Sequence, residues 1–311
     1  MNFASISSFF QGLFGGAIRS GTSILYAALG EVIVERAGIV NLGLEGCMLV
    51  GAAFGFIAAV LTGNSYLGLL VAAIAGGLFN LLLGFLVVTR RASQLASGLV
   101  LYFLGMGLTS LVGANYVGQK INGLDQFSIP LLGQIPWLGP ILFQGDILTF
   151  GIVPCALLVW WALYRTRWGL WLRTVGESRR VAFATGLNPQ WIQYQALFIG
   201  GMLGGIGGAQ LTLSYARAWV ENITAGYGFI AVAIVIFASW RPIRVIAGAL
   251  LFGGAVALQL QLLARNVPVS SFILNMIPYL LTLLVLLWLG RQRRYQMPEG
   301  LKEVFEGTQS S

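Results

Sequence analysis

The chain has 311 residues, of which 57% are hydrophobic and only 9% are charged, and its formal net charge is +8. With a mean hydropathy of +0.83, this composition excludes an ordinary soluble globular domain and is typical of an all-α, polytopic helical membrane protein. The chain has no histidine, and its two cysteines, Cys47 and Cys155, both lie in apolar segments. We therefore expect no metal site, no cofactor and no disulfide framework.

The apolar runs predict about nine transmembrane helices, within a range of about eight to ten, because about 20 helical residues cross a hydrocarbon core of about 30 Å. Residues 3–18 are interpreted as an amphipathic or partly inserted helix before the first span. The seventh span is expected to be short. In chain order the expected spans are about 20–35, 38–61, 66–89, 94–113, 146–164, 195–213, 226–240, 245–264 and 270–289.

These spans predict one transmembrane domain that covers the whole chain. Its expected parts are a first half at about 20–164, a cytoplasmic loop at about 165–195, a second half at about 196–290 and a cytoplasmic tail at 291–311. The 42 glycines fit a tightly packed bundle, because small residues let helix backbones approach closely.

The distribution of basic residues predicts the orientation of the chain. The 165–195 loop carries five arginines against one acid, Glu177, and loops rich in Lys and Arg stay in the cytoplasm. A cytoplasmic C-terminus leaves only Arg19, Lys120, Arg217 and Arg265 outside. Nine spans then place the N-terminus outside, whereas counting residues 3–18 as a tenth span would turn it inward.

A weak internal repeat fits this topology. The stretch NLGLEGCMLVGA at 41–52 resembles TAGYGFIAVAIV at 224–235, since each has a polar residue, a glycine two positions later and then an apolar helix. Residues 93–112 can likewise be aligned with 269–288. Each pair would run in opposite directions across the membrane, as in the inverted repeats of many transporters.

A group of charged residues surrounds the stretch GIVNLGLEG, and charges in a membrane need an explanation. In one interpretation, Asn41 caps a helix that begins inside the protein, and Glu45 lines or gates a solute path. In the other, the stretch is a cytoplasmic turn in which Glu31 or Glu35 pairs with Arg36, and Glu45 makes a structural bond.

Further polar residues in or near the spans face a solute path or form hydrogen bonds between helices. The full set of candidates for the path is Asn41, Glu45, Gln94, Ser97, Thr224 and Asn275. No catalytic residue is expected, because a chain without histidine lacks the usual general base and its lysines are only Lys120 and Lys302. No phosphate-binding GxxxxGK[ST] loop is present, so an ion gradient or a separate ATPase would have to drive active transport.

Three stretches together closely resemble one family. They are ALGEVIVERAGIVNLGLEG at 28–46, YRTRWGLWLRTVGESRRVAFATGLN at 164–188 and TAGYGFIAVAIVIFASWRPIRVIAGALLFG at 224–253. In order and spacing they resemble the inner-membrane permease subunits of bacterial ABC importers for simple sugars, nucleosides and branched-chain amino acids. The nearest branch is that of the nucleoside permeases, which are linked to basic membrane lipoproteins.

The resemblance implies that GESRRVAFATGLN contains the coupling helix, which docks in a groove of the ATPase subunit. The residues that match are Gly176, Glu177, Arg179, Arg180, Ala182 and Gly186. Ala182 and Gly186 lie four positions apart and would form a small-residue face for close docking. The alternative is a basic cytoplasmic loop with a chance A-x-x-x-G. If the docking face exists, bulky replacements of Ala182 or Gly186 would uncouple ATP hydrolysis from uptake.

The same resemblance implies a complex in the bacterial inner membrane with two ATPase subunits, a second permease subunit and an extracytoplasmic substrate-binding protein. The second permease is either another copy of this chain or a longer relative. The longer relative is favoured, because this chain is expected to start without the additional N-terminal span of sugar-type relatives. Cys47 departs from the pattern, which has methionine or another apolar residue there. Membrane lipid is an expected partner. Nucleic acid is not, because the basic residues cluster at span ends.

We therefore interpret the chain as a permease subunit, not an enzyme, that forms the path for a nucleoside or a similar small polar solute. The choice of a nucleoside rests on the resemblance, and a simple sugar or another small solute is the alternative within the class. An ion-coupled secondary transporter is the alternative outside it. That alternative would need a membrane-embedded acid, and Glu45 is the candidate.

Overall fold

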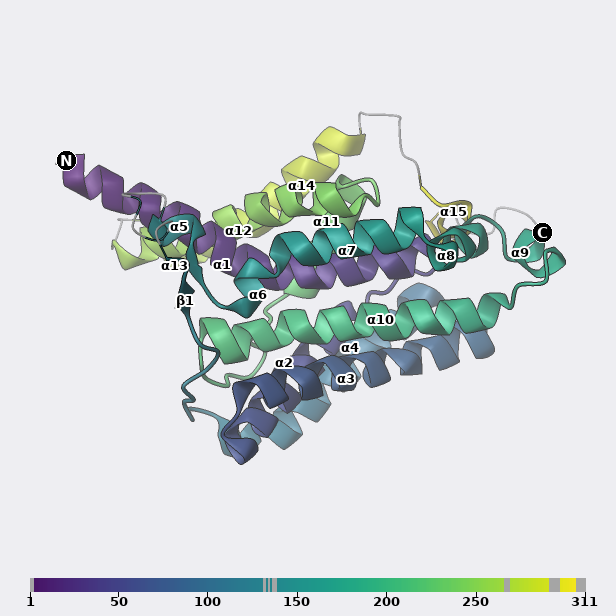
Figure 1. Cartoon of the computed structure of the whole chain (residues 1–311), viewed down its shortest axis with the longest axis horizontal. Coiled ribbons are helices and arrows are strands. Elements are labelled where there is room, and N and C mark those ends of the chain that lie inside the picture. The colour runs from purple at the N-terminus through teal and green to yellow at the C-terminus, as the bar shows by residue number, and fades with distance from the viewer. Residues whose placement is uncertain are drawn as a thin grey trace.

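The computed structural model describes residues 3–130, 133, 135, 139–265, 269–290 and 297–305. Long helices run side by side along the longest axis of the molecule (Figure 1). The long helices are α1 (Phe3–Arg36), α2 (Leu44–Thr62), α3 (Ser65–Gly84), α4 (Gln94–Gly113), α7 (Ile152–Arg165), α10 (Pro189–Gln210), α11 (Tyr227–Phe237), α12 (Pro242–Ala264) and α14 (Ile277–Gly290).

Shorter elements lie mainly at the two ends of these helices. They are β1 (Phe127–Ser128), α5 (Gly139–Leu142), β2 (Gln144–Gly145), α6 (Ile147–Phe150), α8 (Arg167–Glu177), α9 (Arg179–Ala184), α13 (Ser271–Asn275) and α15 (Glu299–Phe305). The strands β1 and β2 pair antiparallel, with Phe127 opposite Gly145. Single π-helical turns extend α3 through Thr89 and α10 through Tyr215.

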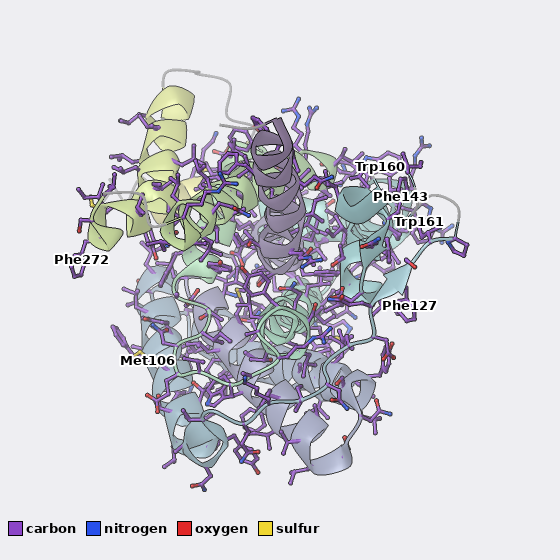
Figure 2. The ribbon with its side chains drawn as sticks, turned by 90° about the vertical axis from the view of Figure 1, so that its left-hand side faces the viewer. Met106, Phe127, Phe143, Trp160, Trp161 and Phe272 are labelled. Carbon is purple, nitrogen blue, oxygen red and sulfur yellow. The ribbon has the colours of Figure 1, made fainter. Side chains whose placement is uncertain are left out.

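The predicted class, an all-α polytopic membrane protein, is confirmed. Among the described residues, six helices are long and apolar enough to cross a membrane, and three shorter apolar helices accompany them. The short seventh span is α11. Large apolar side chains such as Trp161 and Phe272 project from the bundle (Figure 2), and they are 57% and 81% exposed, as expected where a helix faces lipid.

Two segments differ from the predicted spans. Residues 3–18 and the expected first span at 20–35 form a single helix, α1, which contains no proline and packs against α12. The expected ninth span is instead divided into α13 and α14 at Met276. Pro278 explains this break, because it lacks a backbone N–H and its ring would clash with the carbonyl four positions earlier in a continuous helix.

The order of helix packing agrees with an inverted repeat. Helix α1 packs on α12, and its expected counterpart α10 packs on α3. Helix α11 packs against α1, and its counterpart α2 packs in the same way against α10. Helices α1 and α10 also contact each other. Glycines permit these close approaches: a Cβ on Gly205 or Gly253 would overlap the backbone carbonyl of Ala72 or Ala17.

The two ends of the bundle differ in charge. Helices α8, α9 and α15 lie at one end in Figure 1, where the loop of five arginines is found; we call it the arginine end. The opposite end carries α5, α6, α13 and the pair of strands; we call it the loop end. Arg19 and Arg217 line a small polar cavity at the loop end with Asp146. The charge asymmetry used to predict orientation thus separates the two ends.

Candidate solute path and coupling surface

Helices α2 and α11 both begin inside the bundle. After α1 ends at Arg36, residues 37–43 turn back before α2 begins at Leu44. After α10 and its π-helical turn, residues 216–226 return before α11 begins at Tyr227. The two helix starts meet, because the backbone N–H of Gly228 donates to the Glu45 carboxylate at 2.5 Å. We call residues 41–45 and 224–228 the joint.

Glu45 holds the two sides of the joint together. Its carboxylate also accepts hydrogen bonds from the Thr224 hydroxyl at 2.6 Å and from the Gly226 N–H at 2.7 Å, and its side chain is buried. Neither α2 nor α11 has a side-chain cap at its N-cap residue, Gly43 or Gly226. The carboxylate lies in the first turn of α2 and at the first N–H groups of α11, so one acid complements the positive ends of two helix dipoles.

Asn41 does not cap α2, contrary to the sequence-based interpretation. The N-cap is Gly43, because residues 41–43 form a turn that separates the Asn41 side chain from the first helical N–H groups. Instead the buried side-chain amide of Asn41 donates to the side-chain carbonyl oxygen of Asn80 on α3 at 3.0 Å. The Asn80 side-chain amide in turn donates to the backbone carbonyl of Leu197 on α10 at 2.7 Å. Asn41 therefore ties the joint to α3 and α10.

Arg36 does not form the ion pair with Glu31 or Glu35 that one interpretation of the sequence expected. Among the described residues, the ion pair found within 4.0 Å is Lys302–Glu299. Arg36 donates to the Trp240 carbonyl and to the Tyr164 hydroxyl, each at 3.3 Å. Glu35 accepts from the Trp240 indole N–H. Glu31 accepts from the backbone N–H of Asn41 at 3.0 Å. The two acids thus position backbone and aromatic groups.

Most of the predicted path residues come together at the joint. Gln94 at the start of α4 accepts from the Val40 N–H at 2.8 Å, and Ser97 is buried one turn further along α4. Asn41, Glu45 and Thr224 lie in the joint itself. Asn275 ends α13, and its side chain is outside the part of the chain that the structure describes.

A polar cavity lies at the arginine end, next to the segment before α2. It has a volume of about 570 Å³, and its lining includes Gly38, Gln94, Glu177, Arg180 and Gln193. Gln193 donates to the Ala37 carbonyl at 2.9 Å. The cavity therefore lies between Gly38 and Gln94 on one side and residues of the predicted coupling segment on the other.

The predicted coupling segment is in direct backbone contact with residues 37–43. Gly176 near the end of α8 lies so close to α1 that a Cβ on it would overlap the Arg36 carbonyl, and one on Gly38 would lie 3.2 Å from the Gly176 Cα. Glu177 accepts from the Glu299 N–H of α15 at 3.2 Å. Motion of the end of α8 would therefore displace the segment before α2.

The expected small-residue face of Ala182 and Gly186 does not exist. Helix α9 ends at Ala184, and Gly186 follows it with φ of +83°. The bonds Leu187 N–H to Ala182 carbonyl and Gly186 N–H to Phe183 carbonyl, at 3.1 and 3.0 Å, form a Schellman motif that stops the helix. Ala182 is 0% exposed and packs in the core of this chain, whereas Gly186 is exposed.

The exposed surface of α9 is instead apolar and basic. Phe183 is 74% exposed and Val181 is 55% exposed, and both lie beside the exposed Arg179 and Arg180 at the start of the helix. Phe183 and Val181 were not among the coupling residues predicted from the sequence. Their signal in the sequence was the pair of large apolar residues directly after Arg179 and Arg180, which is unusual for a segment that faces only water.

Comparison with known proteins identifies the class. Residues 13–287 match the family described as the branched-chain amino acid transport system permease component. This match covers most of the chain, so the chain belongs to this family of ABC transporter permeases and is a multi-pass membrane protein and a transport subunit. Family membership argues against the ion-coupled alternative.

Individual relatives give narrower comparisons. A putative glucose ABC transporter permease protein of Haloferax volcanii is 37% identical over 90% of this chain and 92% of its own length. A nucleoside ABC transporter permease protein of Lactococcus lactis is 35% identical over 87% of this chain and 90% of its own. A guanosine ABC transporter permease protein of Bacillus subtilis is 34% identical, with 85% and 87% covered.

Bacillus subtilis also has a second, more distant relative. It too is named a guanosine ABC transporter permease protein, and it is 25% identical over 85% of this chain but only 79% of its own length. The match therefore covers a smaller share of this second Bacillus subtilis relative (79%) than of the first (87%), although both matches cover 85% of this chain.

Proposed function

We propose that this chain is the shorter of two permease subunits in an ATP-driven importer for a nucleoside, with α9 as the helix that docks on an ATPase subunit. The observation that carries the proposal is the exposed Phe183 and Val181 on α9 at the arginine end. An aromatic anchor surrounded by arginines is the composition of a protein–protein interface centre. The abundance of arginine at this end supports a cytoplasmic location for α9 and for the C-terminus.

The proposed coupling follows the contacts from α9 inward. Closure of the ATPase subunits would move α9 and the end of α8, where Gly176 touches residues 36–38. Residues 37–43 lead into the start of α2, and Glu45 links this start to α11. The two ends of the path would then alternate in opening, because ATP and the loaded binding protein favour different states.

The proposed substrate is a nucleoside because two of the three relatives compared at 34–37% identity carry nucleoside or guanosine in their names. The 37% identical relative is named for glucose, so a simple sugar is the second candidate. The longer Bacillus subtilis relative supports a longer permease as the partner subunit. An extracytoplasmic binding protein would deliver the solute at the loop end.

Purification of this chain from its native membrane in mild detergent tests the assembly. We expect an ATPase and a second, longer permease to be recovered with it. Reconstitution of that complex in vesicles with the binding protein then tests the substrate. ATP-dependent uptake of labelled guanosine that excess glucose does not reduce would support the proposal, and uptake of glucose that guanosine does not reduce would establish the sugar alternative.

The docking surface has its own test. Phe183→Ala should weaken association with the ATPase by about 2 kcal/mol, which is roughly 30-fold in affinity, because it removes an interface anchor. Trp191→Ala is the matched control, since Trp191 is a 63% exposed aromatic of α10 outside the proposed docking surface. Pull-down of the ATPase at several concentrations measures both variants. Equal recovery with Phe183→Ala and with the unmodified chain would contradict docking through α9.

A further inference from the structure

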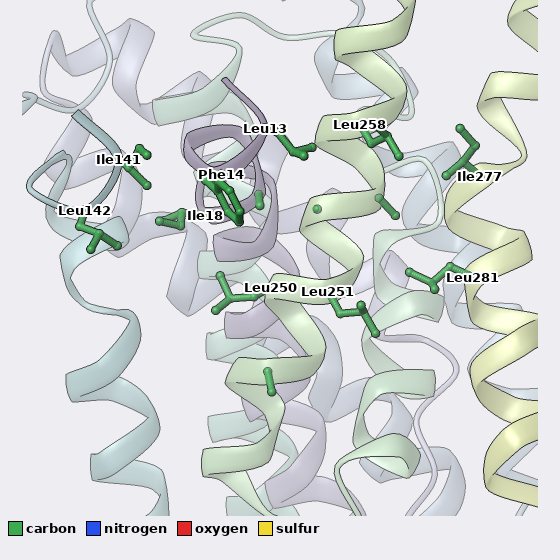
Figure 3. A pocket seen from close by; sticks show the side chains of 14 residues that line it. Leu13, Phe14, Ile18, Ile141, Leu142, Leu250, Leu251, Leu258, Ile277 and Leu281 are labelled. Carbon is green, nitrogen blue, oxygen red and sulfur yellow. The ribbon is translucent and has the colours of Figure 1, made fainter. Parts of the chain in front are cut away.

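An apolar groove opens on the side of the bundle at the loop end. It lies between α1, α12 and α14, with α5 beside it, and has a volume of about 930 Å³ (Figure 3). This volume lies within the range of about 300–1,000 Å³ for small-molecule sites. Its lining consists of aliphatic side chains, glycine, alanine and one phenylalanine, and it includes Leu13, Phe14, Leu250, Leu251, Leu258 and Leu281.

The dimensions of the groove match one leaflet of a bilayer. Its wall on α12 runs from Ala247 to Leu258, a rise of about 16 Å at about 1.5 Å per residue. Half of a hydrocarbon core of about 30 Å is roughly the same length. Phe14, Leu250 and Leu251 are 48%, 40% and 43% exposed, so the groove is open sideways along this length.

A positive charge lies beyond the end of the groove that is nearer the loop end. The guanidinium of Arg265, at the C-terminal cap of α12, lies 4.7 Å from the centre of the Phe9 ring on α1. Phe9 is one helical turn before Leu13, which lines the groove. An apolar slot one leaflet long with an arginine at its interfacial end has the pattern of a phospholipid, in which a phosphate lies above an acyl chain.

We propose that this groove binds a phospholipid of the leaflet at the loop end, with an acyl chain between α1 and α12 and the phosphate at Arg265. The charge at the rim and the single-leaflet length select a lipid over a helix of a partner subunit. A transmembrane helix is about 10–12 Å wide with its side chains and crosses both leaflets. None of the residues that line the groove belongs to the joint, so the site is separate from the candidate solute path.

A photoactivatable phosphatidylglycerol with a diazirine in its acyl chain tests the site. The complete complex is reconstituted in vesicles of phosphatidylethanolamine and phosphatidylglycerol that contain this probe, and labelled residues are mapped by mass spectrometry after illumination. We expect labelling at residues 13–18 and 247–258 to exceed labelling of the exposed face of α3, including Leu70 and Leu78, by at least about fivefold.

Gly254→Phe fills the groove. Gly254 lines the groove, and a Cβ there would lie 3.8 Å from the Ala17 Cβ, which is ordinary contact, so a side chain can begin at this position without overlapping backbone. Gly107→Phe on α4 is the matched control, because a Cβ there meets nothing within 4 Å. Labelling of the groove should fall at least about fivefold in Gly254→Phe and stay unchanged in Gly107→Phe. Arg265→Gln should lower labelling about two- to threefold.

Two results would overturn the proposal. One is labelling of α1 and α12 that is no stronger than that of α3, which would show ordinary boundary lipid only. The other is efficient crosslinking of Leu251→Cys to a second permease subunit in native membranes, which would show that protein covers the groove. Recovery of the ATPase with the Gly254→Phe variant verifies that the variant is folded.

Discussion

The two segments that lead into the joint are held in different ways. Residues 37–43 are fixed by side chains from four helices: Glu31 of α1, Asn80 of α3, Gln94 of α4 and Gln193 of α10. Residues 217–219 of segment 216–226 are held by backbone hydrogen bonds from Gly118 and Ile121, but its end, at residues 224–226, has fewer side-chain anchors. Glu45 accepts from Thr224 and from Gly226, and the Tyr279 hydroxyl donates to the Ala225 carbonyl at 2.8 Å.

This difference separates a rigid side of the joint from a dependent side. Anchors on four helices make the first segment insensitive to the loss of one of them, and Gln193 joins it to α10, the helix that follows the proposed coupling segment. On the second side, the residues before α11 are held by two side chains, the Glu45 carboxylate of α2 and the Tyr279 hydroxyl of α14. Elements with few anchors open at lower free energy, so we expect movement at the joint to occur mainly at α11.

Removal of the shared carboxylate should have the largest effect. Glu45→Ala leaves the Gly226 and Gly228 N–H groups and the Thr224 hydroxyl without an acceptor in a buried site. At about 1–3 kcal/mol for each buried unsatisfied group, the folded state should lose at least about 3 kcal/mol. Glu45→Gln retains one carbonyl oxygen and should lose less. Thermal unfolding in detergent and ATP-dependent uptake measure the effect.

Glu221→Ala is the control for this experiment, because Glu221 is an exposed acid in the same 216–226 segment. It should unfold at nearly the same temperature as the unmodified chain, since exposed substitutions usually change stability by no more than about 0.5 kcal/mol. If Glu45→Ala and Glu221→Ala unfold at the same temperature, the Glu45 carboxylate does not hold the joint, and the proposed difference between its two sides is wrong.

A matched pair of glycines distinguishes the two segments directly. Gly38 and Gly226 both have positive φ, +80° and +88°, so alanine at either position is strained by roughly 1–2 kcal/mol. A Cβ at Gly38 would also lie 3.2 Å from the Gly176 backbone. One at Gly226 would lie 3.3 Å from the Tyr279 hydroxyl, a side-chain group that can shift more readily than backbone, at the expense of its bond to the Ala225 carbonyl. Gly38→Ala should therefore be the more destabilising.

Gly38→Ala should also reduce coupling, because its added methyl group pushes against the end of α8. The measurement is the ratio of solute taken up to ATP hydrolysed in reconstituted complexes. We expect this ratio to fall several-fold for Gly38→Ala and to change little for Gly226→Ala. The opposite order would place the coupling contact on the second segment and not on the first.

The helices were largely predictable from the sequence, because apolar runs of about 20 residues have few other solutions in a membrane. The continuous α1 was missed because a run of serines and glycines before residue 20 looks like the end of a helix, while packing on α12 keeps it helical. The break at Met276 was missed although Pro278 signals it, because the apolar run continues on both sides.

The residues of the joint were also predictable, since buried charged and polar groups in apolar sequence are rare. Their partners were not. Nothing near Glu45 in the sequence indicates that its carboxylate accepts hydrogen bonds from residues 224–228, because this contact depends on how α2 and α11 meet. Likewise the spacing of Ala182 and Gly186 assumed a helix through both, and the left-handed Gly186 ends it first.

The smallest effect is expected from the loss of one anchor on the rigid side. Asn41→Ala removes the bond to Asn80 and leaves the Asn80 carbonyl without that donor, which should cost about 1 kcal/mol. The bonds from the Val40 and Asn41 backbone N–H groups to Gln94 and Glu31 do not depend on the Asn41 side chain, so they remain. Thermal unfolding of Asn41→Ala, Asn80→Ala and the double variant gives the coupling between the two side chains. A loss as large as that of Glu45→Ala would mean that the first segment also depends on a single contact, and movement at the joint could then no longer be assigned mainly to α11.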